Sequence, residues 1–145
     1  MLKVFSMTVA EAEELIRQFE SCQLPKEKWT HEAHFVMALW YCCHQPLSLA
    51  IQFIKEGIKR YNISVGDVNT DDAGYHETIT VFYITLIINY IIQPDPDQSF
   101  ENKLSGLWIQ AFLQKDYPFR YYSKGLLMSK EARKDWIPPD IQSMS

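Results

Sequence analysis

Two short segments, 30–34 and 75–80, hold three of the four histidines of this chain. The first reads Thr-His-Glu-Ala-His and the second Tyr-His-Glu-Thr-Ile-Thr, so each has a His-Glu pair in the expected first turn of a helix. Imidazole both ligates transition metals and exchanges protons near neutral pH. If the two helices are neighbours, we expect His31, His34 and His76 to converge in one pocket, as catalytic groups or as ligands of a divalent metal such as zinc.

The side chains around these histidines suit a ligand pocket. The second segment supplies hydrogen-bonding groups, which we expect to form the ligand-binding wall: Tyr75, Glu77, Thr78 and Thr80. The positive end of the helix dipole disfavours a protonated imidazole, so neutral rings are expected. The same field has a purely structural consequence, since a glutamate in a first turn stabilises a helix by about 0.3–1 kcal/mol. The His-x-x-His spacing differs from that of zinc proteases, so Glu32 is assigned no role as a general base.

A structural interpretation of the same histidines remains open. A histidine near a helix start can simply tie two segments together through hydrogen bonds. The chain is then a non-catalytic ligand-binding or interaction module, in which the histidines orient a ligand or brace the bundle. The sequence itself specifies neither a reaction nor a substrate.

The polar segment before the second motif partly matches a calcium-binding loop. Asp67, Asn69 and Asp71 occupy the first three ligand positions of that loop. The match fails where glycine is needed, because Asp72 stands there, and where a bidentate glutamate is needed, because Thr78 stands there. We therefore interpret this segment as a loop beside the histidine pocket.

Helical periodicity and capping residues predict the elements that position these side chains. Thr8 and Glu11 form a capping box for a first helix. Thr30 caps a second, which runs from His31 to about His44. This helix is apolar nearly all round from Ala33 to Cys43, which predicts a place at the centre of the bundle. Further helices are expected over 46–61 and over 75–92, where length outweighs many β-branched residues. A helix capped by Ser99 is expected to carry Leu104 to Phe112 on one face, and a short one follows a cap at Ser129. The sequence thus predicts an all-α, single-domain bundle of about five helices with an irregular C-terminal segment.

Composition places the chain among compact globular domains. Its 145 residues suit one domain spanning 1–145, and 47% of them are hydrophobic. The formal net charge of −4, with acids mixed among the C-terminal bases, argues against a nucleic-acid-binding surface. The longest apolar run, 79–92, is too short to span a bilayer, and residues 1–7 lack the pattern of a signal peptide. Together with an odd number of cysteines, these features predict a cytoplasmic protein that binds neither nucleic acid nor membrane. The small-molecule ligand is expected from the histidine pocket alone.

Several segments taken together resemble a family of small uncharacterised bacterial proteins. They are Trp29-Thr30-His31-x-x-His34, Tyr75-His76-Glu77-Thr78-Ile79-Thr80, Tyr121-Tyr122-Ser123, Ala132-Arg133 and, after Trp136, Pro139-Asp140. The resemblance extends from Trp29 to about Ile141, and the family has no established activity. It implies that Arg133 and Asp140 belong with the histidine motifs, through packing or an ion pair near the site. Arg133 is therefore included among the expected ligand-binding residues.

Overall fold

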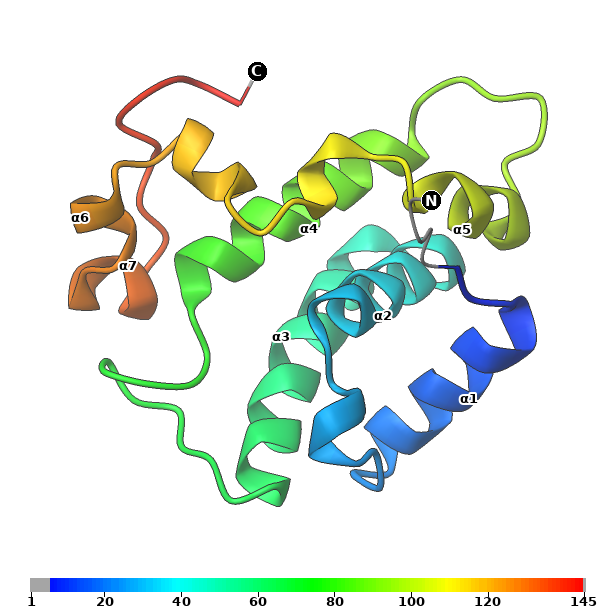
Figure 1. The fold of residues 1–145 in the computed structure, drawn as a ribbon, viewed down its shortest axis with the longest axis horizontal. Helices are drawn as coiled ribbons and strands as arrows, with labels where there is room; N and C mark the ends of the chain where they lie inside the picture. Colours follow the sequence, from blue (N-terminus) through cyan, green and yellow to red (C-terminus); the bar gives the residue numbers. More distant parts are fainter. Residues whose placement is uncertain (1–5, 145) are drawn as a thin grey trace, which may run out of the picture.

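The computed structural model describes residues 6–144, and within them the fold is all-α (Figure 1). Five longer helices are followed by two short ones. Their bounds are α1 Val9–Glu20, α2 His31–His44, α3 Leu47–Ser64, α4 Glu77–Ile91, α5 Phe100–Leu107, α6 Lys124–Leu127 and α7 Lys130–Lys134. The predicted all-α bundle with an irregular C-terminal segment is confirmed.

The helix starts follow from capping chemistry, as the sequence indicates. Thr8 and Glu11 form a reciprocal capping box at α1. Thr30, Ser99 and Ser129 each accept a hydrogen bond from the backbone three residues later, at the starts of α2, α5 and α7. Because these caps satisfy backbone N–H groups that would otherwise lack partners, they fix where each helix begins.

Helix α2 forms the centre of the bundle. It packs against α1, α3, α4 and α5, which surround it in Figure 1. A helix covered on all sides must be apolar around its whole circumference, and α2 has this composition. Its buried residues are Ala33, Phe35, Val36, Met37, Ala38, Leu39, Tyr41 and Cys42.

Helix α4 connects the two ends of the molecule. In Figure 1 it runs from α7 at one end to the neighbourhood of α5 at the other. Its β-branched residues would favour a strand, yet it is a helix, because packing against α2 and α7 buries its apolar side chains. The neighbourhood of α2 and α4 that the histidine hypothesis requires is therefore confirmed.

Two element boundaries differ from the sequence prediction. Helix α3 continues three residues past Tyr61, to Ser64. The α5 helix ends at Leu107 and does not carry Phe112, which lies in a separate 3-10 turn at Ala111–Leu113. The turn lets the Phe112 ring pack 5.7 Å from that of Phe35 and 6.0 Å from that of Tyr90, between centroids. A continuous helix would have placed Phe112 elsewhere, so tertiary packing decides this boundary.

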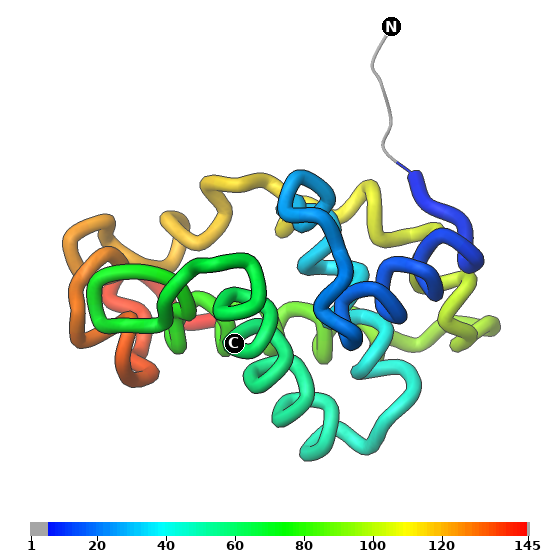
Figure 2. The backbone as a smooth tube through the Cα atoms, turned by 90° about the horizontal axis from the view of Figure 1, so that it is seen from below, coloured from blue at the N-terminus to red at the C-terminus, as the bar shows by residue number. Residues whose placement is uncertain are grey.

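The C-terminal segment gathers at the opposite end of the molecule from α1, as the orange-to-red and blue parts of the tube show in Figure 2. It has a small core of its own, made by Phe82 of α4 with Tyr122 and Leu127. Among residues 6–144, none of the helices has the length and apolar character needed to cross a membrane.

Candidate functional site

The first histidine motif lies at the start of α2, where Thr30 takes the capping position. The Thr30 hydroxyl accepts the Ala33 N–H at 3.1 Å. His31 is thus the first residue of the helix and His34 the fourth, and neither ring is needed to cap it. Their side chains are free to face the space between α2 and its neighbours.

The His34 ring has one fixed nitrogen and one open nitrogen. Its Nδ1 lies 2.6 Å from the carbonyl oxygen of Thr30. A carbonyl can only accept, so Nδ1 carries the proton and Nε2 carries the lone pair. Nε2 has no hydrogen-bond partner within the described part of the chain. All fully buried side-chain nitrogens and oxygens there are partnered, so Nε2 faces accessible space.

The surroundings of His34 keep its imidazole neutral. Its ring stacks on Trp29 with centroids 3.8 Å apart. Burial lowers the pKa of His34 to about 4, although the hydrogen bond to Thr30 acts in the opposite direction. At neutral pH the ring is therefore an uncharged hydrogen-bond acceptor.

His31 joins α2 to a distant part of the chain. Its Nε2 donates to the carbonyl of Leu113 at 2.8 Å. The ring also makes edge contacts with Phe35 and Tyr83, at centroid distances of 4.9 and 6.1 Å. His31 therefore has both a bracing role and a place on a cavity wall.

A cavity of about 260 Å³ lies between α2, α3 and α4, and both histidines of the first motif line it. Its remaining wall is mostly apolar, with hydroxyls only from Thr80 and Tyr83. Burial raises the pKa of the Tyr83 phenol, which stays protonated and can donate. The lining residues are His31, His34, Phe35, Met37, Ala38, Ile54, Ile58, Ile79, Thr80, Tyr83 and Ile84.

A more open hollow of about 620 Å³ adjoins this cavity. The two share His34, Ile58, Ile79 and Thr80 as wall residues. The loop between α3 and α4 forms its other side, and because the two spaces share these walls we call this hollow the mouth of the cavity. His76 also lines it, and here the two motifs meet.

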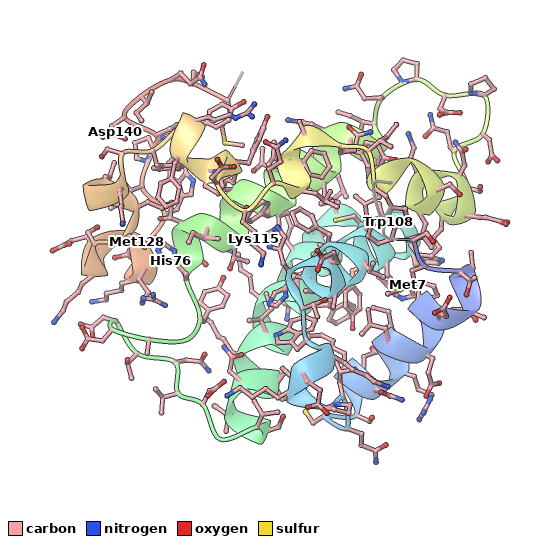
Figure 3. The ribbon with its side chains drawn as sticks, viewed as in Figure 1. Met7, His76, Trp108, Lys115, Met128 and Asp140 are labelled. Atoms are coloured by element: carbon pink, nitrogen blue, oxygen red, sulfur yellow. The ribbon has the colours of Figure 1, made fainter. Side chains whose placement is uncertain are left out.

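The second motif uses its histidine differently. His76 is itself the capping residue of α4, because its Nδ1 accepts the Ile79 N–H at 3.1 Å. Its Nε2 donates to the carbonyl of Leu127 at 2.8 Å. Both ring nitrogens are therefore bonded within the protein, at the first turn of α4 beside the short C-terminal helices (Figure 3). Burial lowers the pKa of His76, so this ring too is neutral.

The two threonines of the second motif also have different roles, one structural and one on the cavity wall. Thr78 is fully buried, and its hydroxyl donates to the Asp135 carbonyl at 2.9 Å and accepts the Ile137 N–H at 3.1 Å. It lines none of the cavities described, whereas Thr80 lies on the wall of the cavity and of its mouth. Thr78 thus fastens the C-terminal segment to α4, and Thr80 faces the site.

Tyr75, Glu77 and Arg133 lie on a separate polar cleft. The Tyr75 hydroxyl donates to Glu77 at 2.6 Å, and Lys55 pairs with the other oxygen of Glu77 at 2.9 Å. Burial would raise the pKa of Glu77, but these two hydrogen bonds outweigh it and lower that pKa. Arg133 donates to the carbonyl of Gly74 at 2.6 Å, which ties α7 to the loop. These expected ligand-binding residues therefore do not line the histidine cavity, although Tyr75 also reaches its mouth.

The three histidines are not grouped around one point in the described part of the chain. Within residues 6–144, no three His, Cys, Asp or Glu side chains are grouped so as to hold a metal ion. His76 has no free nitrogen to offer a metal, and none of the cavities described is lined by all three rings. The expected zinc site with His31, His34 and His76 as ligands stays a prediction, and in the structure two of these histidines, His31 and His34, line one cavity.

Comparisons of this chain with family models, with curated proteins and with solved structures gave no match. The resemblance suggested by the motifs stays a prediction. Of the two residues that it adds, Arg133 contacts the second motif through Gly74 and Tyr75. Asp140 instead accepts the Ser123 N–H at 2.7 Å, within the C-terminal segment.

Sequence reasoning missed several residues of these sites. Tyr83 and the isoleucines of the cavity wall look in the sequence like ordinary core positions. Lys55 and Lys59 of the polar cleft are four residues apart on α3 and so share a helix face. That spacing is a usable signal, but nothing in the sequence connects the pair with Arg133 on a distant helix.

Proposed function

We propose that this protein binds a small, mainly apolar molecule in the cavity between α2, α3 and α4, and that His34 Nε2 accepts a hydrogen bond from it. The observation that carries the proposal is an open, lone-pair-bearing imidazole nitrogen on the wall of a mostly apolar cavity. Ligand sites commonly combine apolar walls with a few placed polar groups.

The size of the cavity supports a ligand of about one aromatic ring with substituents. A buried apolar cavity of about 150 Å³ already accommodates benzene, and this one measures about 260 Å³. Its mouth, between the α3–α4 loop and α4, gives such a molecule a path from solvent. Thr80 and Tyr83 supply further hydroxyls beside the ring of His34.

The low basicity of His34 favours a role in binding over a role as a general base. A catalytic base works best with a pKa near the working pH. Burial holds the pKa of His34 at about 4, so its nitrogen accepts a hydrogen bond but takes up a proton poorly. The second function in contention, an interaction module with purely structural histidines, fits His76 but leaves the open nitrogen of His34 unused.

Phenol and toluene test the proposal because they have nearly the same shape, and phenol carries a hydroxyl where toluene carries a methyl group. The affinity of each is measured by NMR titration of the full chain. In the H34F variant the phenol-to-toluene affinity ratio should fall by about 3–10-fold, which corresponds to the loss of one hydrogen bond. The Phe ring can still stack on Trp29, and the Thr30 carbonyl still accepts the His34 backbone N–H.

His44 supplies the matched control. It has the same arrangement at the other end of α2, with Nδ1 bonded to the Trp40 carbonyl and the ring stacked on Trp40, but it lines none of the cavities described. The H44F variant should keep the wild-type ratio. Ala38→Leu, which fills the cavity, should weaken both probes. The proposal is wrong if neither probe binds saturably or if the ratio is unchanged in H34F.

A further inference from the structure

The polar cleft beside α3, α4 and α7 is rich in cationic side chains. Its volume is about 700 Å³. Four cations and two carboxylates line it, together with Tyr75 and two small polar residues of the loop. The charged residues are Lys55, Lys59, Arg133, Lys134, Asp71 and Glu77. This local excess of positive charge stands against a formal net charge of −4 for the whole chain.

One of the two carboxylates of the cleft, Glu77, is engaged by other side chains. Glu77 accepts from Lys55 and from the Tyr75 hydroxyl. Asp71 lies in a loop whose negative charge also acts on Lys130, the partner of Asp72 at 3.1 Å. With Glu77 engaged by Lys55, the cleft keeps the single negative charge of Asp71 against the three positive charges of Lys59, Arg133 and Lys134.

Three cations of the cleft have no carboxylate within ion-pair distance among the described residues: Lys59, Arg133 and Lys134. Elsewhere on the surface, lysines such as Lys26 and Lys130 do pair with nearby acids. Unpaired cations that converge from two helices raise the local positive potential, which attracts an anion.

Two of these cations are also held in place. The Lys59 ammonium lies over the Tyr75 ring, 4.6 Å from its centroid. The Arg133 guanidinium is anchored through Nη1 on the carbonyls of Gly74 and Tyr75. A guanidinium has five N–H donors, so its Nε and Nη2 groups remain for an oxyanion.

We infer that this cleft binds a doubly charged phosphate group, free or as a phosphate monoester, through Lys59, Arg133 and Lys134. The excess of two positive charges in the lining matches a dianion, and the fixed guanidinium matches its oxygen geometry. The inference rests on the cleft alone, so its test is independent of the apolar cavity and of His34.

Titration with inorganic phosphate at pH 7.5 and constant ionic strength tests the inference, with binding measured by calorimetry and by NMR shifts of the loop amides. We expect saturable binding that weakens at least about tenfold in the Lys59→Gln/Lys134→Gln double variant. Both lysines are exposed, so the fold should be retained. Lys124→Gln, an exposed lysine outside the cleft, should stay within about twofold of the wild type.

Two further ligands sharpen the result. Acetate, a monoanion, should bind more weakly than phosphate. Phenyl phosphate distinguishes the sources, since tighter binding than phosphate identifies a monoester and equal binding identifies free phosphate. Absence of saturable phosphate binding, equal losses in Lys124→Gln and the double variant, or acetate binding as tight as phosphate would overturn the inference.

Discussion

The two histidine motifs look alike in sequence but differ in whether a ring nitrogen remains without a hydrogen bond to the protein. In the first, Thr30 caps α2, and His34 keeps an open Nε2 on a cavity wall. In the second, His76 caps α4 itself and gives its other nitrogen to the Leu127 carbonyl. One motif is available to a ligand, and the other joins two segments of the chain.

The residue that precedes each His-Glu pair accounts for part of this difference. Thr30, directly before the first pair, takes the cap with its hydroxyl, so the imidazole of His31 is not used as a cap and donates to the Leu113 carbonyl instead. Tyr75 cannot cap in this way, so the imidazole of His76 does so. Position relative to the cap therefore decides which histidine caps its helix, whereas tertiary contacts decide which ring nitrogen stays open.

The largest effect that this comparison predicts is the loss of stability in His76→Ala. The variant removes a helix cap and leaves the buried Leu127 carbonyl without its partner, which together should cost about 2–4 kcal/mol of unfolding free energy. Urea denaturation at constant slope measures it. His76→Asn should recover part of the loss, because asparagine still caps while the bond to Leu127 is absent. A cost below about 1 kcal/mol for His76→Ala would contradict the bracing role.

Thr78→Val should have the next largest effect. The isosteric change leaves both the Asp135 carbonyl and the Ile137 N–H without the hydroxyl that joins them to α4, at a cost of about 1–3 kcal/mol. Thr85 on the same helix is the control, because its hydroxyl bonds only to the Val81 carbonyl one turn earlier. Thr85→Val should change the unfolding free energy by less than about 0.5 kcal/mol. Equal effects at the two positions would show that Thr78 does not fasten the C-terminal segment.

The smallest effect is the pH dependence contributed by His34. Its pKa is about 4 in the folded protein against 6.5 unperturbed, so between these values the unfolded chain binds a proton that the folded chain does not. Stability is therefore full above pH 6.5 and falls as the pH drops toward 4, by about 1–2 kcal/mol for this half-buried ring. His76, whose pKa is also lowered, acts in the same direction. Urea midpoints from pH 7.5 to 4 should show a flatter curve for H34F than for the wild type, and parallel curves would refute the assignment.

The sequence by itself determined the helical class and most helix starts. Thr8 with Glu11, Thr30 and Ser99 identify their helices through local hydrogen bonds, which need no distant partner. The all-round apolar character of α2 likewise placed it at the centre. These features depend on residues close together in the sequence, so they can be predicted without a structure.

Only the tertiary structure decided which histidine nitrogen stays open. The partners of His31 and His76 are the carbonyls of Leu113 and Leu127, 82 and 51 residues further along the chain. No local pattern specifies such contacts, because a backbone carbonyl is the same at every residue. The polar cleft depends in the same way on Arg133 meeting Lys59 across α3 and α7. Spacing predicted that histidines would gather near the starts of α2 and α4, but long-range hydrogen bonds determined that His34 faces the cavity and His76 closes the fold.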